Sequence, residues 1–230
     1  LRPSGNAGPL SVSLESFSTY HRDSAWTWEH LALTRARVVS GTSKFREHIE
    51  AAIRNALTTE RPADELLVSV SDMRARMAAE NRSENPWNVK HVRGGLVDCE
   101  FIAQYLQLQH AHENPTTLNT GTVSAIRNLA EARILGAEIA ETLITATRLW
   151  RRLQGLLRLT LDGPADPSTF PRPLQQQLAA AGQTENFETL ESDLHQTAQQ
   201  VYDLFQTIID EPAAAVRAAR DNNHDKEPNS

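Results

Sequence analysis

The feature that most constrains the fold is an apolar seam in residues 136–161. Its apolar positions alternate steps of four and three: Ile139, Leu143, Ala146, Trp150, Leu153 and Leu157. One face of an α-helix repeats at this spacing, which is typical of helices that pack antiparallel in a bundle. We therefore predict one long helix here, with its apolar face in the core.

Shorter seams predict further helices on both sides of this segment. The expected ranges are about 43–60, 62–80, 96–111, 121–133, 173–181 and 185–210. Pro and Gly residues break the chain between several of them, and Trp87–Val92 reads as a short extended segment. Good helix formers are abundant throughout. We therefore predict an all-α fold, an antiparallel helical bundle.

A tryptophan-rich segment near the start predicts another helix. Asp23 or Ser24 can cap it, and Gly41 ends it as a C-terminal cap. Trp26 and Trp28 are expected in the core rather than as a stacking platform. Charges beside an apolar face need partners, so we expect other elements to supply partners for Glu29, Arg35 and Arg37.

Composition excludes several classes of protein. A formal net charge of -6 argues against a general nucleic-acid binder. No apolar run approaches the ~20 residues of a membrane span. The lone cysteine, Cys99, excludes an internal disulfide framework and fits a reducing cytoplasm. The rings of His110 and His112 diverge at a helix end with no third ligand at useful spacing, so we expect no metal there.

Three blocks in order carry a family resemblance. Leu1–Leu10 reads Leu-Arg-Pro-Ser-Gly-x-x-Gly-x-Leu, and Ala25–Gly41 contains Trp-Thr-Trp-Glu and Arg-Ala-Arg. The third block is Val89–Phe101, in which the motif Lys-x-x-x-Gly-Gly-x-x-Asp-Cys-Glu-Phe begins at Lys90. Together they resemble the glutamine synthetase adenylyltransferase family, and Ser4 with Trp26-Thr27-Trp28 is similar to its C-terminal half. Cys99 stands where the family has Ile or Val, a tolerable core replacement.

The resemblance implies a domain organisation and an activity. Residues 1–44 are expected to be the C-terminal remnant of a nucleotidyltransferase domain, residues 45–212 the helical bundle, and residues 213–230 a flexible tail. The family attaches AMP from ATP to a tyrosine of glutamine synthetase, uses Mg²⁺, and responds to the PII signal protein. These partners place the protein in the cytoplasm.

The same resemblance places the catalytic carboxylates outside this chain. The family holds its metal ions with an Asp-x-Asp pair and a third Asp on the strand just before the first block. Leu1 is not an initiator Met, and the Pro- and Gly-rich opening reads as the exit from a strand. We therefore expect the chain to begin inside a domain, to contain no catalytic residue, to bind neither ATP nor Mg²⁺ tightly, and to be inactive alone.

Two groups of residues remain as candidates for phosphate or nucleotide contact. The first follows the expected third aspartate and consists of Arg2, Ser4 and Gly5, with the alternative that they only form a turn. The second combines a cation, two glycines at a helix start and two carboxylates: Lys90, Gly94, Gly95, Asp98 and Glu100. The alternative is structural: Asp98 caps the helix or pairs with an arginine, and Glu100 is buried and paired. Two apart on a helix, these carboxylates point to different sides.

Three functions are compatible with these patterns. The first is the helical part of an adenylyltransferase half, and the second is a helical interaction module of a PII uridylyltransferase-like protein. The Glu-Phe ending of the third block and the Trp-Thr-Trp-Glu block favour the first. The third is a free-standing helical scaffold, which the broken start at Leu1 disfavours.

Overall fold

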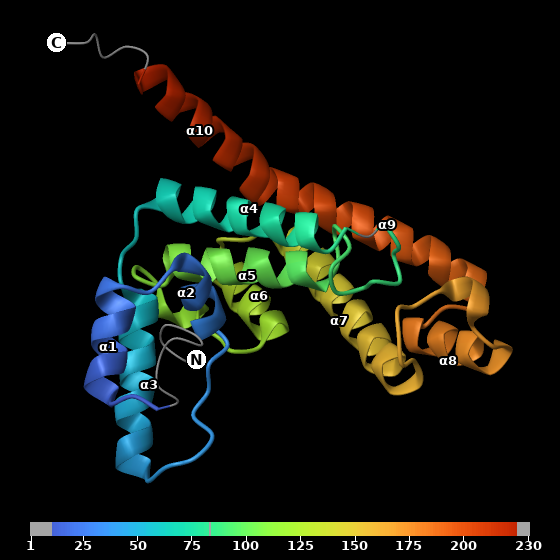
Figure 1. The fold of residues 1–230 in the computed structure, drawn as a ribbon, viewed down its shortest axis with the longest axis horizontal. Helices are drawn as coiled ribbons and strands as arrows, with labels where there is room; N and C mark the ends of the chain where they lie inside the picture. Colours follow the sequence, from blue (N-terminus) through green and yellow to red (C-terminus); the bar gives the residue numbers. More distant parts are fainter. Residues whose placement is uncertain (1–10, 83, 225–230) are drawn as a thin grey trace.

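The computed structural model describes residues 11–82 and 84–224, and this part of the chain is helical with no β-strand (Figure 1). The predicted all-α fold is confirmed. The helices in chain order are α1 Leu14–Asp23, α2 Thr27–Leu33, α3 Ser43–Thr58, α4 Ala63–Glu80, α5 Leu96–His110, η2 Pro115–Thr117, α6 Thr122–Glu131, α7 Ala137–Thr160, η3 Pro167–Thr169, α8 Arg172–Gly182, α9 Phe187–Phe205, η4 Gln206–Asp210 and α10 Glu211–His224.

Helix α5 is the centre of the bundle. It packs against α2, α4, α6, α7 and α9, and nearly every residue from Leu96 to Leu108 is buried. A helix that is apolar on all sides has to be surrounded, and α5 lies between α4 and α6 in Figure 1. Its buried Gln107 is satisfied, because its amide donates to the Ala103 carbonyl at 3.1 Å and accepts from Asn119 N–H at 2.8 Å.

The seam that predicted the longest helix lies where expected. Helix α7 runs from Ala137 to Thr160 and buries Leu143, Trp150 and Leu153 completely. It packs against α5, α6, α8 and α9 and so closes one side of the core. Helix α3 begins after Thr42, whose hydroxyl accepts from Phe45 N–H at 3.4 Å, and α4 begins after Pro62 and ends at Glu80. These predictions are confirmed.

The tryptophan-rich helix is much shorter than predicted. Helix α2 ends at Leu33, and the chain leaves it through tight turns in which the Thr34 hydroxyl donates to the Leu31 carbonyl at 2.6 Å. Trp26 is the residue before the helix, and its side chain is 71% exposed. Trp28 is 48% exposed, whereas Leu31 and Leu33 of the same helix are buried. The prediction that both tryptophans lie in the core is wrong.

The segment around Trp87 is a series of turns and not an extended strand. Asn88 N–H donates to the Asn85 carbonyl at 3.0 Å, and His91 N–H donates to the Asn88 carbonyl at 2.9 Å. The turns place the Trp87 ring in the core, stacked on Phe187 at 5.1 Å between centroids and edge-on to Phe170 at 5.3 Å. Aromatic packing fixes the conformation here, and it involves residues about 100 positions away.

The predicted helix end at Pro212 is also wrong. After α9 the chain makes one π turn, in which Glu211 N–H donates to the Gln206 carbonyl five residues back, and α10 then continues to His224. A proline inside an α-helix removes a donor and crowds the preceding turn, and a widened turn relieves both problems. The predicted tail at residues 213–230 is therefore helical up to His224, and residues 225–230 lie outside the described residues.

Candidate functional site

A buried ion pair joins α4 to the start of α5. The Asp98 side chain is completely buried and the Arg74 side chain is 1% exposed. Arg74 Nε donates to Asp98 Oδ1, and Arg74 Nη2 donates to Asp98 Oδ2 at 3.3 Å. The same Nη2 also lies 3.2 Å from the His91 carbonyl and 3.4 Å from the Val92 carbonyl. The guanidinium is thus a bidentate partner of Asp98 and a clamp on the turns before α5.

The Gly94–Gly95 turn also contacts the Asp98 carboxylate. Gly94 N–H donates to Asp98 Oδ2, so the carboxylate holds the turn that precedes α5. Gly94 has a φ of +78° and lies against the Ala198 backbone of α9, where a Cβ would overlap the carbonyl. A Cβ on Gly95 would lie 2.8 Å from two carbonyl oxygens, those of Val89 and Val92. Both glycines are therefore required by close backbone approach.

The first amides of α5 are already bonded within the protein. Leu96 N–H donates to the Val89 carbonyl at 2.9 Å, and Val97 N–H donates to the Lys90 carbonyl at 3.1 Å. A helix start binds anions through unpaired amides. Here these amides hold the preceding turns, so the geometry of Gly94, Gly95 and Asp98 supports the structural alternative.

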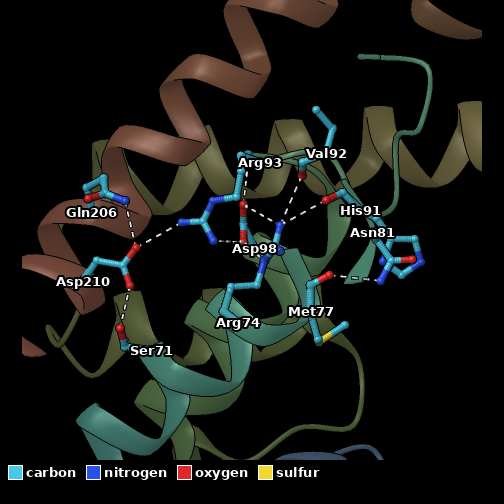
Figure 2. A network of polar contacts seen from close by, with 11 residues as sticks. Ser71, Arg74, Met77, Asn81, His91, Val92, Arg93, Asp98, Gln206 and Asp210 are labelled. Atoms are coloured by element: carbon cyan, nitrogen blue, oxygen red, sulfur yellow. Dashed lines mark hydrogen bonds and ion pairs between the residues drawn. The ribbon is translucent and has the colours of Figure 1, made fainter. Parts of the chain in front are cut away.

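A second polar layer links the turn to the C-terminal helices (Figure 2). Arg93 forms an ion pair with Asp210 at 3.0 Å, lies 3.9 Å from Asp98, and stacks over the rings of Tyr202 and Phe205 at 5.0 and 4.8 Å. Asp210 belongs to the π turn, and it also accepts hydrogen bonds at 2.8 Å from Ser71 of α4 and from Gln206. Asp210 therefore connects the turn at Arg93, helix α4 and the C-terminal helices α9 and α10.

Glu100 lies on a different side of α5 and joins another pair of segments. Its Oε1 is 2.8 Å from Arg35 Nη1, after α2, and 3.6 Å from Arg151 Nη2 of α7. Arg151 also donates to the Thr122 hydroxyl of α6 at 2.8 Å. The expectations that Asp98 and Glu100 diverge, and that Arg35 pairs with another element, are both confirmed. Glu29 likewise accepts from the Tyr20 hydroxyl of α1 at 2.8 Å, whereas Arg37 has no ion pair among the described residues.

Cys99 packs as a core residue. Its side chain is completely buried, and burial raises the pKa of its thiol to about 12, with Thr147 as a neighbour. A thiol with this pKa stays protonated and unreactive at neutral pH.

The remaining predicted residues lie apart from this cluster or outside the described chain. Lys90 is exposed and faces a cavity beside α7. Arg2, Ser4 and Gly5 lie outside the described residues. The structure therefore brings Gly94, Gly95 and Asp98 together, and Glu100 and Lys90 each point elsewhere.

Three residues of the network escaped the sequence analysis. Arg74 lies between the apolar positions Met73 and Met77 of α4, and Arg93 and Asp210 are 117 positions apart. The available signal was the buried Asp98 itself, which required a cation on a facing helix. Nothing local to Arg74 marked it as that partner, and nothing local to Asp210 marked it as the partner of Arg93.

The carboxylates of the site do not fit a Mg²⁺ ion. Mg²⁺ needs carboxylate oxygens that are open to it and to phosphate. Both oxygens of Asp98 face Arg74, Arg93 or Gly94 N–H, and Glu100 faces two arginines. The described residues hold no group of three or more His, Cys, Asp or Glu side chains arranged for a metal, and no helix among them is long and apolar enough to cross a membrane.

Comparisons with known proteins match the two parts of the chain separately. Residues 1–52 match the family model described as glutamate-ammonia ligase adenylyltransferase, and residues 64–209 match the model described as GlnD PII-uridylyltransferase. Several bacterial proteins named bifunctional glutamine synthetase adenylyltransferase/adenylyl-removing enzyme are also similar. The protein from Bradyrhizobium diazoefficiens is 42% identical over 217 residues, which are 94% of this chain and 22% of that protein. Those from Rhodopseudomonas palustris strain BisB5 and Xanthobacter autotrophicus are 44% and 40% identical over 91% and 93% of the chain.

The fold and these matches define the chain as a helical domain, residues 64–209, that follows a segment matched by a separate adenylyltransferase model, residues 1–52. More particularly, the chain belongs to the GlnD PII-uridylyltransferase family, in the form found in the glutamine synthetase adenylyltransferases. The resemblance stated from the three sequence blocks is thereby confirmed. The chain spans about a fifth of the length of the curated relatives that it matches.

Proposed function

We propose that this chain works as the helical domain of an enzyme that transfers AMP from ATP to a tyrosine of glutamine synthetase. The observation that carries the proposal is the junction at Glu100. Arg35 belongs to the segment matched by the adenylyltransferase model, and Glu100 and Arg151 belong to the segment matched by the helical-domain model. One carboxylate thus ties the transferase segment to the bundle.

The exposed apolar surface of the transferase segment supports this assignment. Five large apolar side chains of residues 11–52 are exposed, namely Val12, Trp26, Trp28, Val39 and Phe45. Three of them, Val12, Val39 and Phe45, line a cavity of about 350 Å³ between α1, α3 and residues 36–40. Contiguous exposed apolar surface marks an interaction site. In our proposal the preceding part of the adenylyltransferase domain covers it and carries the carboxylates that hold Mg²⁺ and ATP.

The chemistry assigned to this chain is positioning. The bundle holds the transferase segment through Glu100 and presents surfaces for glutamine synthetase and the PII signal protein. Its lone buried thiol is consistent with action in the cytoplasm. Arg2, Ser4 and Gly5 are proposed to contact phosphate at the edge of the active site.

Labelled substrates test the proposal with the longer protein that contains this chain. We expect label from [α-³²P]ATP to appear on glutamine synthetase, and Glu100→Gln to reduce its rate about tenfold because the junction loosens. Glu138→Gln, an exposed carboxylate of α7 without an ion pair, is the matched control. Transfer of label from [α-³²P]UTP to PII, with none to glutamine synthetase, would establish the uridylyltransferase alternative and overturn the proposal.

A further inference from the structure

A cavity of about 460 Å³ lies beside the bundle, away from the Asp98 cluster. One wall is formed by the turns at residues 85–91, and the other by the end of α7 and the residues after it, up to Ala165. The size is within the range of pockets that bind small organic molecules. Its floor includes Leu157, Leu161 and Pro164, which offer apolar surface.

The lining of this cavity is entirely neutral or basic. Lys90, His91 and Arg158 line it, and no carboxylate does among the described residues. The chain as a whole carries 29 acidic residues against 23 Lys and Arg, so a carboxylate-free cavity with three basic groups departs from the protein's average. Three other cavities contain carboxylates: Glu50 in one, Glu185 and Glu188 in the second, and Glu138 and Asp203 in the third.

Asn81 and Asn85 of this cavity are hydrogen-bonded within the protein, and other polar groups there are available for a ligand. Neither Lys90 nor Arg158 has an ion-pair partner within the described chain, and the side chains of Asn88 and Gln154 make no hydrogen bond there. His91 Nδ1 is buried and has no partner among the described residues, while its carbonyl is held by Arg74 (Figure 2). Because Nδ1 is shut off from solvent, a ligand in the cavity could contact the ring only through its other nitrogen, Nε2.

Two of the side chains that line the cavity, Lys90 and Arg158, are cationic at neutral pH. Burial, Lys90 and Arg74 lower the pKa of His91, so its ring is neutral at pH 7. An anion placed there would be attracted by Lys90 and Arg158 and would accept a hydrogen bond from His91. Lys offers a mobile point charge and Arg a planar fork, and the two together suit the several oxygens of a phosphate group.

We propose that this cavity is a binding site for a small phosphate-bearing molecule, held by Lys90, His91 and Arg158 with its apolar part against Leu157 and Leu161. The site is distinct from the one at which AMP would be transferred, and the proposal does not depend on adenylyl transfer. Because Lys90 adjoins the turns that Arg74 clamps, an occupied cavity would stiffen the segment that precedes α5.

Calorimetric titration of the 230-residue chain tests the proposal. The probes are inorganic phosphate, pyrophosphate, ATP and unphosphorylated adenosine, each without added metal. We expect the phosphorylated probes to bind and adenosine not to bind. Binding by phosphate and pyrophosphate alone identifies a free-phosphate site, and tighter binding by ATP identifies a phosphorylated nucleoside. Failure of all of them at millimolar concentration would overturn the proposal.

Variants and hydrogen exchange assign the binding to this cavity. Lys90→Gln and Arg158→Gln should each weaken binding about tenfold, because each removes a charge-assisted contact. Arg152→Gln, which replaces an exposed and unpaired arginine of the same helix, should leave it unchanged. The ligand should slow amide exchange in residues 85–92 and 157–165. Equal weakening by the Arg152 variant, or protection elsewhere only, would show that the charge of the protein and not this cavity attracts the anion.

Discussion

The four tryptophans divide the molecule into two regions that are built differently. Trp87 and Trp150 in the bundle are 2% and 0% exposed, whereas Trp26 and Trp28 beside α2 are 71% and 48% exposed. Among its described residues the bundle exposes one large apolar side chain, Leu159 of α7, and α5 is surrounded on all sides. The region of α1 to α3 buries one face and leaves Val39 and Phe45 in solvent.

The difference shows that the large exposed apolar side chains gather in the region of α1 to α3. The bundle supplies its own polar partners as well, since Arg74, Asp98, Arg93 and Asp210 satisfy one another. Residues 11–52 are joined to it through the Arg35–Glu100 pair and through packing of α2 on α4 and α5. The boundary between the two family matches, at residues 52–64, separates the same two regions.

Replacement of a buried tryptophan should give the largest effect. Trp150 lies on α7 against the centre of the core, and truncation leaves a cavity that the neighbouring helices cannot fill. We expect Trp150→Ala to lower the free energy of unfolding by about 4 kcal/mol. Urea unfolding followed by far-ultraviolet circular dichroism measures it. A loss below about 1 kcal/mol would show that the bundle is not the tightly packed region.

Breaking the buried ion pair should cost slightly less. Arg74→Met leaves the Asp98 carboxylate buried without its bidentate partner, and we expect a loss of about 3 kcal/mol. The double variant Arg74→Met/Asp98→Leu removes both charges and should regain at least half of that loss. The same urea titrations measure both. An equally unstable double variant would show that Asp98 stabilises the protein mainly through the hydrogen bond that it accepts from Gly94 N–H.

A buried histidine should make the smaller region sensitive to acid. His21 of α1 is 4% exposed, contacts Phe17, Tyr20 and His30, and has no hydrogen-bond partner on either ring nitrogen among the described residues. Burial and the neighbouring His30 lower its pKa to about 4. The unfolded chain therefore binds the proton first, so stability is full above about pH 6.5 and falls as the pH drops towards 4.

We expect this loss to reach about 2 kcal/mol over that interval. Urea unfolding at several pH values measures it, with tryptophan fluorescence reporting on α2. His21→Leu should flatten the pH dependence, and His48→Leu, at an exposed position of α3, should not. An unchanged pH dependence in the His21 variant would assign the sensitivity to another group.

The smallest effect is expected at an exposed tryptophan. Trp26→Ala should change the free energy of unfolding of the chain by less than about 0.5 kcal/mol, because most of the ring is already in solvent. It keeps the backbone N–H that Glu29 accepts from at 3.0 Å. In the longer protein the same variant should lower activity, if the apolar surface is covered there. A large loss in the isolated chain would instead place Trp26 in its core.

Sequence patterns predicted the bundle well and the smaller region poorly, for one physical reason. Helices α4 and α7 carry long periodic seams, so their spans followed from repetition of the same spacing. Helix α2 has seven residues, and two tryptophans in such a short stretch do not show which face is buried. For the candidate site too, local features were predicted and contacts between distant segments were not. The divergence of Asp98 and Glu100 is local geometry, but their partners Arg74 and Arg35 are set by how distant helices meet.

The π turn at Gln206–Asp210 has a consequence for how this sequence can vary. The turn holds one residue more than an α-helical path needs, so everything after it is rotated by about 100° relative to an uninterrupted helix. That rotation directs Ala213 and Arg217 towards α4, where Arg217 reaches Asp72 at 2.7 Å. Deletion of a single codon in this stretch would keep a helix and preserve its composition, yet turn the whole of α10 away from its contact surface. The contacts of α10 therefore depend on the rotational register of the helix after the π turn more than on any one side chain.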